Sequence, residues 1–359
     1  MLRIKNPFYC IKIIQQKVSY QEYLAARESV STLGQPIITF IFIMALALGI
    51  VSIYHILSSD MRTYQLSAQL RKISTVLLVI GFIIIAWFHL RIYQTIELVY
   101  PPELANYMAA NMGVSATSLR FAVPLWIETE KIYFWTLCLS IFLTVTNFRY
   151  DFSRTKMTAL FSSSLNIMLS IFMVFSYMVN PFKEPLPGLH SEITGWYQAA
   201  GAGDPNILYG ALYQLYFRII YFYNSEYMWT HPPMLFIAYA SLVVTFVGCV
   251  FMLFRREKIF DRISYNHAKV GYLLLTVGML IGYPWAVVAW EGKEWWWDPK
   301  INGSIMMWVL YSAYLHSRIY IKRRNMWRAT AVLGIICFLS LVFTYLLTYI
   351  APGIHAISQ

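Results

Sequence analysis

Charged residues are scarce in this 359-residue chain: they make up 13% of it, against 58% for hydrophobic residues. Soluble domains usually carry roughly 25% charged residues, so this composition excludes an ordinary soluble protein. The sequence also lacks a Walker phosphate-binding motif and a GxGxxG turn after a strand, so nothing indicates nucleotide-driven transport. Long apolar stretches joined by short polar ones predict an all-α polytopic membrane protein.

Paired cysteines are lacking as well. The four cysteines stand singly, with no CxxC pair and no zinc-ligand spacing, and all but the first lie in apolar segments: Cys10, Cys138, Cys249 and Cys337. Isolated cysteines of this kind predict neither a disulfide framework nor a thiol-exchange site. A secretory signal peptide is not expected either, because the first apolar run begins only after about 36 residues.

Apolar segments of spanning length, about 20 residues each, are what the sequence has in abundance. We expect about eight transmembrane helices, near 36–57, 73–93, 132–148, 157–180, 232–254, 268–290, 303–321 and 328–350. Two longer outer loops, at about 94–131 and 181–231, separate them. The expected divisions are an N-terminal amphipathic segment (1–35), the N-terminal transmembrane helices (36–180), an extracytoplasmic loop (181–231) and a C-terminal core (232–359).

Basic residues give the expected orientation. The formal net charge of +11 is concentrated in short loops, which is typical of membrane topology rather than of nucleic-acid binding. The connections 255–269 and 318–328 are strongly basic and should be cytoplasmic. The connection after residue 290 and the C-terminus should then be extracytoplasmic. Eight spans also place the N-terminus outside, although residues 1–35 carry five basic residues, so its side stays open.

The most distinctive segment reads WEGKEWWWDPK, residues 290–300. Tryptophans that merely anchor the chain at the headgroups are the simplest explanation. Three in a row, followed by Asp298 and a proline that cannot continue a helix, exceed what anchoring requires. Asp298 is expected to fix the connection by accepting backbone hydrogen bonds. A flat aromatic surface of this kind suits a large, planar, amphipathic ligand, of which haem is the leading example.

Two histidines are expected at the depth of this tryptophan-rich segment. His231 opens the fifth span in WTHPPMLF, and His355 follows the eighth span in APGIHAISQ. Two neutral imidazoles can bind both faces of a haem iron. A lone interfacial histidine is usually only a polar residue, but two at one depth beside an aromatic platform predict an outer haem site.

His316 lies inside the seventh expected span, in YLHSRIY. Ionisable groups within spans are functional candidates, and the alternative is a hydrogen bond to a neighbouring helix. A second, inner haem bound by His316 would need another ligand. Candidates are His55 if the N-terminus is outside, His89 if it is inside, or a residue of another chain. His190 and His267 are interpreted as loop residues without a role.

With these motifs in place, residues 266–318 resemble the tryptophan-rich signature region of a haem-handling superfamily. The strings TVGMLIGYPWAVVAW, WWWDPK and LYSAYLHSR are most similar to the CcsA (ResC) family of cytochrome c biogenesis proteins. Other features resemble the haem lyase CcmF instead, namely HPP at 231–233 and PLWIETEKIYFW at 124–135. Which of these two branches the chain serves stays open.

The resemblance implies that His231 and His355 are the axial ligands that hold haem b, and that His316 is one ligand of a transmembrane haem. It assigns the rest of the haem-binding surface to the tryptophan-rich segment: Trp290, Gly292, Trp295, Trp296, Trp297, Asp298 and Pro299. The implied protein is a subunit of a cytochrome c synthase (haem lyase) in the bacterial cytoplasmic membrane. Its implied partners are a CcsB/ResB-type membrane protein, an apocytochrome c with CxxCH motifs, and thiol reductant proteins.

The implied reaction attaches haem covalently to CxxCH motifs of the partner. The chain has no CxxCH of its own, so it is not itself a c-type cytochrome. Alternatives from the sequence are a haem exporter and a CcmF-like lyase subunit without independent synthase activity. A haem-b quinol oxidoreductase would need paired histidines deep in adjacent spans, and a polyisoprenoid glycan carrier would need several outward carboxylates and arginines.

Overall fold

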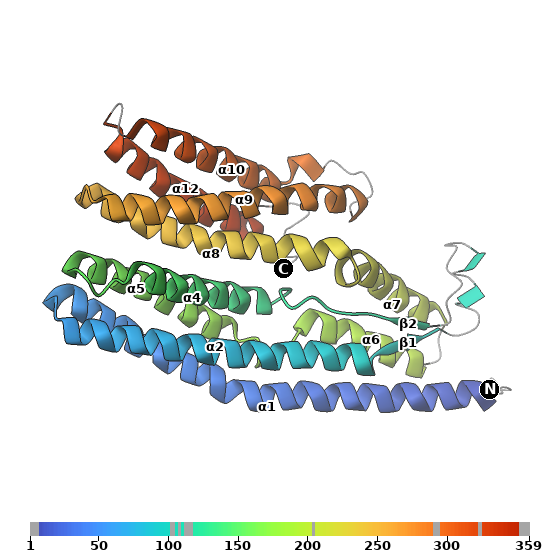
Figure 1. Ribbon diagram of the computed structural model, residues 1–359. Coiled ribbons are helices and arrows are strands. Elements are labelled where there is room, and N and C mark those ends of the chain that lie inside the picture. The colour runs from blue at the N-terminus through green and yellow to red at the C-terminus, as the bar shows by residue number, and fades with distance from the viewer. Residues whose placement is uncertain are drawn as a thin grey trace. The chain divides into compact units, whose positions relative to one another are not determined.

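The computed structural model describes residues 7–100, 105–106, 109–110, 118–202, 205–289, 295–321 and 325–351. Three residues of the predicted site, Trp290, Gly292 and His355, lie outside the described residues, and Trp295 is described by its backbone alone. The helices of the N-terminal half (Figure 1) are α1 (Pro7–Ser58), α2 (Met61–Thr95), α4 (Glu130–Tyr150) and α5 (Lys156–Val179).

The C-terminal half continues with the helices α6 (Pro187–Ala202), α7 (Pro205–Arg218), α8 (Glu226–Phe254), α9 (Lys258–Ala289), α10 (Pro299–Ser317) and α12 (Trp327–Ile350). Short turns accompany them: the π-helix η1 (Ile219–Tyr223) and the 3₁₀ turns η2 (Trp295–Trp297) and η3 (Arg318–Tyr320). The strands β1 (Glu97–Val99) and β2 (Ser118–Arg120) pair antiparallel, with Leu98 opposite Leu119. The predicted all-α polytopic fold is thus confirmed, with one small ribbon added.

Within the described part of the chain, seven helices are long and apolar enough to cross a membrane: Ser19–Ser58, Met61–Thr95, Glu130–Tyr150, Lys156–Val179, Glu226–Phe254, Lys258–Ala289 and Trp327–Leu347. They correspond to seven of the eight expected spans. The eighth, expected at 303–321, is α10, which is not among the seven. With 19 residues it is about 28 Å long, close to the roughly 30 Å of a hydrocarbon core.

Two segments expected to be non-spanning are more regular than the sequence indicates. The N-terminal segment continues into the first span as one helix of 52 residues, with Pro36 inside it. The connection 181–231 contains α6, α7 and η1. Propensity alone does not predict helices here, because tertiary packing supplies most of a short helix's stability.

The chain forms two compact units. Unit 1 comprises Met1–Thr39, Ile80–Lys131 and Val179–Met228, and unit 2 comprises Phe40–Val79, Ile132–Met178 and Trp229–Gln359. The boundaries fall inside α1, α2, α4, α5 and α8, so both units contain parts of spanning helices.

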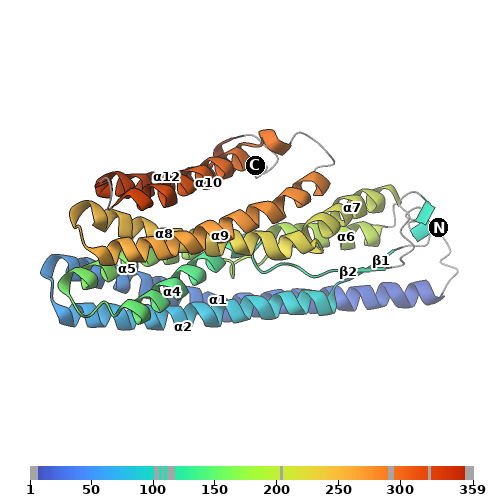
Figure 2. The same cartoon turned by 45° about the horizontal axis from the view of Figure 1, so that its top comes forward.

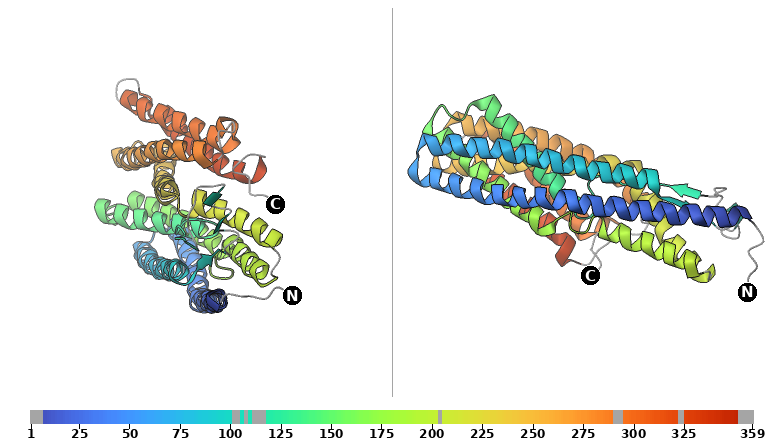
Figure 3. Two further views of the ribbon diagram at one scale, coloured as in Figure 1. Left: turned by 90° about the vertical axis from the view of Figure 1, so that its right-hand side faces the viewer. Right: turned by 90° about the horizontal axis from the view of Figure 1, so that it is seen from below.

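Unit 1 is built around α6 and the first part of α1. The Phe182 ring lies against the backbone of Gly34, where any Cβ would clash. The Glu128 carboxylate accepts hydrogen bonds from the backbone N–H groups of Gly188 (2.9 Å) and Leu189 (3.0 Å). It therefore satisfies two of the N–H groups left without helical partners at the start of α6. Figure 3 shows the first part of α1 running beside the end of α2.

Unit 2 contains a group of antiparallel helices, α8, α9, α10 and α12 (Figure 2). Buried residues of α8 run without interruption from Ala238 to Thr245, as expected for a helix covered on several sides. Gly303 of α10 faces Thr344 of α12 at one end, and Ser317 donates to Thr330 at the other (3.2 Å). These contacts make α10 and α12 antiparallel.

Candidate functional site

Three glycines of α9 allow α8 to approach closely. The pairs, with the closest distance that an added Cβ would make, are Gly271 with Leu242 (2.6 Å), Gly278 with Leu235 (2.9 Å) and Gly282 with His231 (2.5 Å). From one pair to the next, the residue number rises along α9 by as much as it falls along α8, so the two helices pack antiparallel. We call these three contacts the glycine register. The steps of seven and four residues keep all three pairs on one helix face.

His231 lies at the end of this register, flat against the α9 backbone. Its Nδ1 is 2.6 Å from the carbonyl oxygen of Gly278, and a Cβ at Gly282 would overlap its ring. Because a carbonyl oxygen can only accept, Nδ1 carries the hydrogen. The lone pair of the neutral imidazole is then on Nε2, and such a second-shell carbonyl is what normally orients a metal-binding histidine.

Trp285 completes the surroundings of this imidazole. Its indole is 7% exposed, and its ring centroid is 6.3 Å from that of His231 with an interplanar angle of 23°. Trp285 was not among the predicted site residues, although it belongs to a string that carries the family resemblance. The signal that was overlooked is its position three residues after Gly282, which places it beside the same ring.

The prolines that follow His231 change the hydrogen bonding at the start of α8. Pro232 has no N–H, so the Met228 carbonyl loses the donor that a regular helix would supply four residues on. The indole Nε1–H of Trp126 donates to that carbonyl at 2.8 Å. The double proline is therefore tolerated inside a helix at the point where the chain presents His231.

The tryptophan-rich segment leads directly into α10. Trp295–Trp297 form the 3₁₀ turn η2, and the side chains of Trp296 and Trp297 are 46% and 70% exposed. Asp298 is 4% exposed and is the N-cap of α10. Its Oδ1 accepts from the backbone N–H groups of Lys300 (2.9 Å) and Ile301 (3.2 Å).

These contacts agree with the backbone hydrogen bonds expected of Asp298. Pro299 occupies the first helical position, where a missing N–H costs nothing. The burial and bonding of Asp298 explain its role in shaping the turn. Its role as a haem contact stays a prediction.

α10 is fixed against α9 as well as α12. The indole Nε1–H of Trp308 donates to Thr276 Oγ1 at 2.8 Å, and its ring stacks on Tyr272 with centroids 5.7 Å apart. Because successive helices alternate in direction, the starts of α8 and α10 and the ends of α9 and α12 lie at one end of this group. His231, Trp285 and the turn η2 share that end.

His316 belongs to the opposite end of α10. Its side chain is exposed, and its Nδ1 is 2.8 Å from the carbonyl oxygen of Ser312, one turn earlier. Here too the carbonyl places the imidazole hydrogen on Nδ1 and the lone pair on Nε2. His316 and His231 thus lie at opposite ends of this group of helices, and the haem-binding role of each stays a prediction.

The two candidate partners of His316 lie in different units. His55 is 1% exposed in unit 2, with Nδ1 2.8 Å from Ser163 Oγ. His89 is 4% exposed in unit 1, with Nδ1 2.8 Å from the Val123 carbonyl and Nε2 3.7 Å from Glu130 Oε1. Among the described residues no contact joins either of them to His316, so the second ligand of an inner haem stays a prediction.

The two histidines interpreted as loop residues both lie in helices, and that interpretation was wrong. His267 is 9% exposed within α9, with Nε2 2.8 Å from Thr146 Oγ1. His190 lies in α6, with Nδ1 3.2 Å from the Tyr23 hydroxyl. Burial, followed by the nearby Arg27 charge, lowers the pKa of His190, so its ring is neutral near pH 7. Both act as packed, hydrogen-bonded side chains.

Acidic ligands for a bare metal ion are not gathered anywhere in the described part of the chain. No group of three or more His, Cys, Asp or Glu side chains there is arranged to hold a metal ion. The arrangement at His231 is of another kind: one oriented imidazole beside indole surfaces. It suits a ligand that combines a coordinating centre with a large apolar face.

Comparison with known proteins places the chain in a family. Residues 125–355, more than half of the chain, match the family described as "Cytochrome C assembly protein". A "Cytochrome c biogenesis protein CcsA" from Gloeobacter violaceus is 40% identical over 97 residues, 27% of this chain and 28% of the relative. Its counterpart from Synechococcus sp. strain CC9311 is 47% identical over 66 residues, 18% of this chain and 21% of the relative. The matches span about a quarter of these relatives.

A solved structure described as "Cytochrome c Heme Lyase CcmF" is similar in fold, with a TM-score of 0.59 and 18% sequence identity. The similarity covers 88% of this chain and 47% of that protein. The family match runs from the residues before α4 to beyond the end of α12, and so includes the glycine register, His231 and the tryptophan-rich turn. This chain is therefore a multi-pass membrane protein that belongs to the cytochrome c assembly protein family.

Proposed function

We propose that this chain is the haem-handling membrane subunit of a cytochrome c synthase, which presents haem b for covalent attachment to the CxxCH motifs of an apocytochrome c. The observation that carries the proposal is the geometry of His231. Its Nδ1 is held by the Gly278 carbonyl, its ring lies on Gly282, and the Trp285 indole lies alongside. The imidazole is thus pre-oriented, with its lone pair on Nε2.

The residues around His231 fit haem as a substrate. Trp296 and Trp297 expose indole surface at the same end of unit 2. Burying about 300 Å² of apolar haem surface against such side chains would contribute about 7 kcal/mol before the costs of binding. Lys300 lies in the first turn of α10, where its ammonium can pair with a propionate.

His355 is the proposed ligand on the other face of the iron. It lies outside the described residues, but Ala351 ends α12 at the same end of unit 2 as His231. His355 follows Ala351 by four positions in the sequence. This short distance along the sequence from the end of α12 supports the assignment.

The proposed chemistry rests on positioning. Each thiol of CxxCH adds across one haem vinyl group: a carbon–sulfur bond forms and the thiol hydrogen ends on the other vinyl carbon. Correct orientation of the reacting groups can contribute roughly 7–11 kcal/mol in favourable cases. The chain's own residues bind and orient the substrate, and release requires one of the two histidines to yield to the histidine of CxxCH.

The remaining parts of the proposal concern the partner proteins and the side of the membrane on which haem is presented. The exposed side chain of His316 suits a ligand set completed by another chain, and a CcsB/ResB-type membrane protein is the proposed source. Thiol reductant proteins would keep the CxxCH cysteines reduced. Arg255 and Arg256 follow α8 at the end opposite His231, and by the positive-inside rule this supports a tryptophan-rich end on the extracytoplasmic side of the bacterial cytoplasmic membrane.

Co-expression tests this function. The chain, a ResB-type partner and an apocytochrome with CxxCH should yield a cytochrome whose haem stays attached after denaturation, and His231→Ala should abolish that product. Haem that copurifies without any covalent product would favour the exporter. Wild-type protein that binds no haem in haem-replete cells would refute haem handling altogether.

A further inference from the structure

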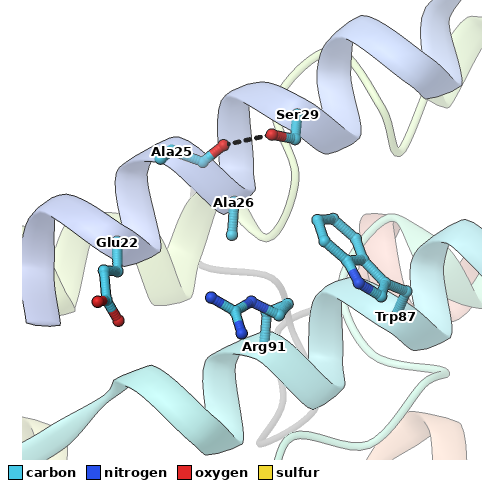
Figure 4. Close-up of a pocket in the computed structure, with 6 residues that line it drawn as sticks. All are labelled: Glu22, Ala25, Ala26, Ser29, Trp87 and Arg91. Atoms are coloured by element: carbon cyan, nitrogen blue, oxygen red, sulfur yellow. Dashed lines mark hydrogen bonds between the residues drawn. The ribbon is translucent and has the colours of Figure 1, made fainter.

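A groove in unit 1 lies between α1 and α2 (Figure 4). Its volume is about 350 Å³, and it is lined by Glu22, Ala25, Ala26, Ser29, Trp87 and Arg91. Two small alanines leave the space, and the larger side chains border it. Ligand pockets typically measure about 300–1,000 Å³, so this groove fits a headgroup-sized molecule rather than haem.

The lining of the groove changes from charged side chains at one end to an aromatic side chain at the other. Glu22 and Arg91 extend toward it at one end, from facing helices, and Trp87 and Ser29 lie at the other (Figure 4). Arg91 donates to Gln94 through Nη1 (3.1 Å), which leaves most of its donors for a ligand. Among the described residues, Glu22 and Arg91 do not form an ion pair with each other.

Apolar surface continues from the tryptophan end. Trp87 is 39% exposed, and one turn further along the two helices Ile83 and Leu33 are 60% and 55% exposed. These residues approach the apolar stretches of the two spans, whereas Glu22 lies on the polar side. Tryptophan prefers the boundary between headgroups and acyl chains, so we expect the groove at the membrane interface, with its charged end toward the headgroup layer.

We propose that this groove binds one phospholipid whose headgroup carries a phosphate and a primary ammonium. Arg91 holds the phosphate, Glu22 accepts from the ammonium, and Trp87 lies over the glycerol and the start of the acyl chains, which continue along Ile83 and Leu33. The order of groups along the groove matches the order along the lipid. A carboxylate facing a guanidinium disfavours a purely anionic headgroup and favours a zwitterion.

Native mass spectrometry of the purified full-length chain tests the site. The probes are phosphatidylethanolamine, phosphatidylcholine and phosphatidylglycerol with identical acyl chains. Wild-type protein should retain phosphatidylethanolamine best. Arg91→Gln should weaken its retention roughly tenfold, since one charge-assisted contact is lost, whereas Arg62→Gln, an exposed arginine of the same helix, should change nothing.

Two further variants separate the parts of the site. Glu22→Gln should remove the preference for phosphatidylethanolamine over phosphatidylglycerol without lowering total lipid binding. Ala25→Leu should fill the groove and reduce retention while both charges stay. Equal retention of the three lipids by wild-type protein, or unchanged retention by Arg91→Gln, would overturn the proposal. So would equally tight binding of phosphoethanolamine without acyl chains.

Discussion

His231 in unit 2 and His89 in unit 1 share one hydrogen-bond pattern and differ in everything around it. Each has Nδ1 close to a backbone carbonyl, that of Gly278 (2.6 Å) or Val123 (2.8 Å). His89 is 4% exposed, with a buried carboxylate, Glu130, 3.7 Å from Nε2. His231 is half-buried beside an indole and rests on a glycine.

The tautomer of a histidine alone therefore does not define a ligand site. Both imidazoles are oriented for coordination through Nε2. In unit 1 that atom lies 3.7 Å from a buried carboxyl group, that of Glu130, which suits a closed pair that stabilises the fold. In unit 2 the surroundings are apolar and aromatic, which suits a large ligand. Substitutions at the two histidines should therefore differ in kind.

The largest expected effect is loss of haem from His231→Ala. Removing an iron ligand should weaken haem binding by at least roughly tenfold, because even losing the groups that orient a ligand costs that much. Absorption spectra of purified protein measure it, and added imidazole should restore the spectrum by occupying the vacated position. Wild-type haem content in this variant would exclude His231 as a ligand.

His89→Ala should instead destabilise the protein. The Val123 carbonyl loses its buried hydrogen-bond donor, which costs about 1–3 kcal/mol, and the Glu130 carboxyl group loses a neighbour 3.7 Å away. Thermal unfolding in detergent should show the decrease, with no rescue by imidazole. If stability is unchanged while a haem signal disappears, His89 is the inner-haem ligand and the comparison fails.

Substitutions at two glycines of α9, Gly282 and Gly278, should differ in their smaller effect on haem affinity. Gly282→Ala places a Cβ 2.5 Å from His231 Cε1, whereas Gly278→Ala meets the flexible end of Leu235 at 2.9 Å. Haem affinity should fall several-fold in the first variant and stay near wild type in the second. Equal losses in both variants would show that helix packing, rather than the orientation of His231, controls binding.

The smallest effect concerns the tryptophan-rich turn. Asp298→Ala removes the N-cap of α10 and should cost roughly 1 kcal/mol of stability, whereas Asp298→Asn keeps an effective cap. Equilibrium unfolding of the two variants measures the difference. If Asp298→Asn lowers haem binding while stability is preserved, the carboxylate contacts the ligand in addition to capping the helix.

Much of the fold follows from the sequence, because spans must bury continuous apolar surface and satisfy their own backbone groups. That reasoning located seven spanning helices, and the sequence also predicted that Asp298 accepts backbone hydrogen bonds. It missed α6 and α7, whose stability depends on packing within unit 1. It also assigned His267 to a loop, because the basic residues of 255–269, among them Arg262 and Lys269, suggested a polar connection where α9 had already begun.

Only part of the candidate site could be predicted from the sequence. Tryptophan and histidine are functional candidates by residue type alone, so the sequence was sufficient to select His231 and the tryptophans of η2. Gly278, Gly282 and Trp285 act through their positions on the face opposite α8, and only pairing the two helices reveals them. A search for matching seven- and four-residue steps in adjacent spans would have found this register.

The most direct test is an experimental density map of the purified chain with its bound haem. The account predicts that the iron is coordinated by Nε2 of His231, with Nδ1 on the Gly278 carbonyl and the Trp285 indole beside the imidazole. Iron coordinated elsewhere, with His231 still packed on Gly282 and not touching the haem, would contradict it.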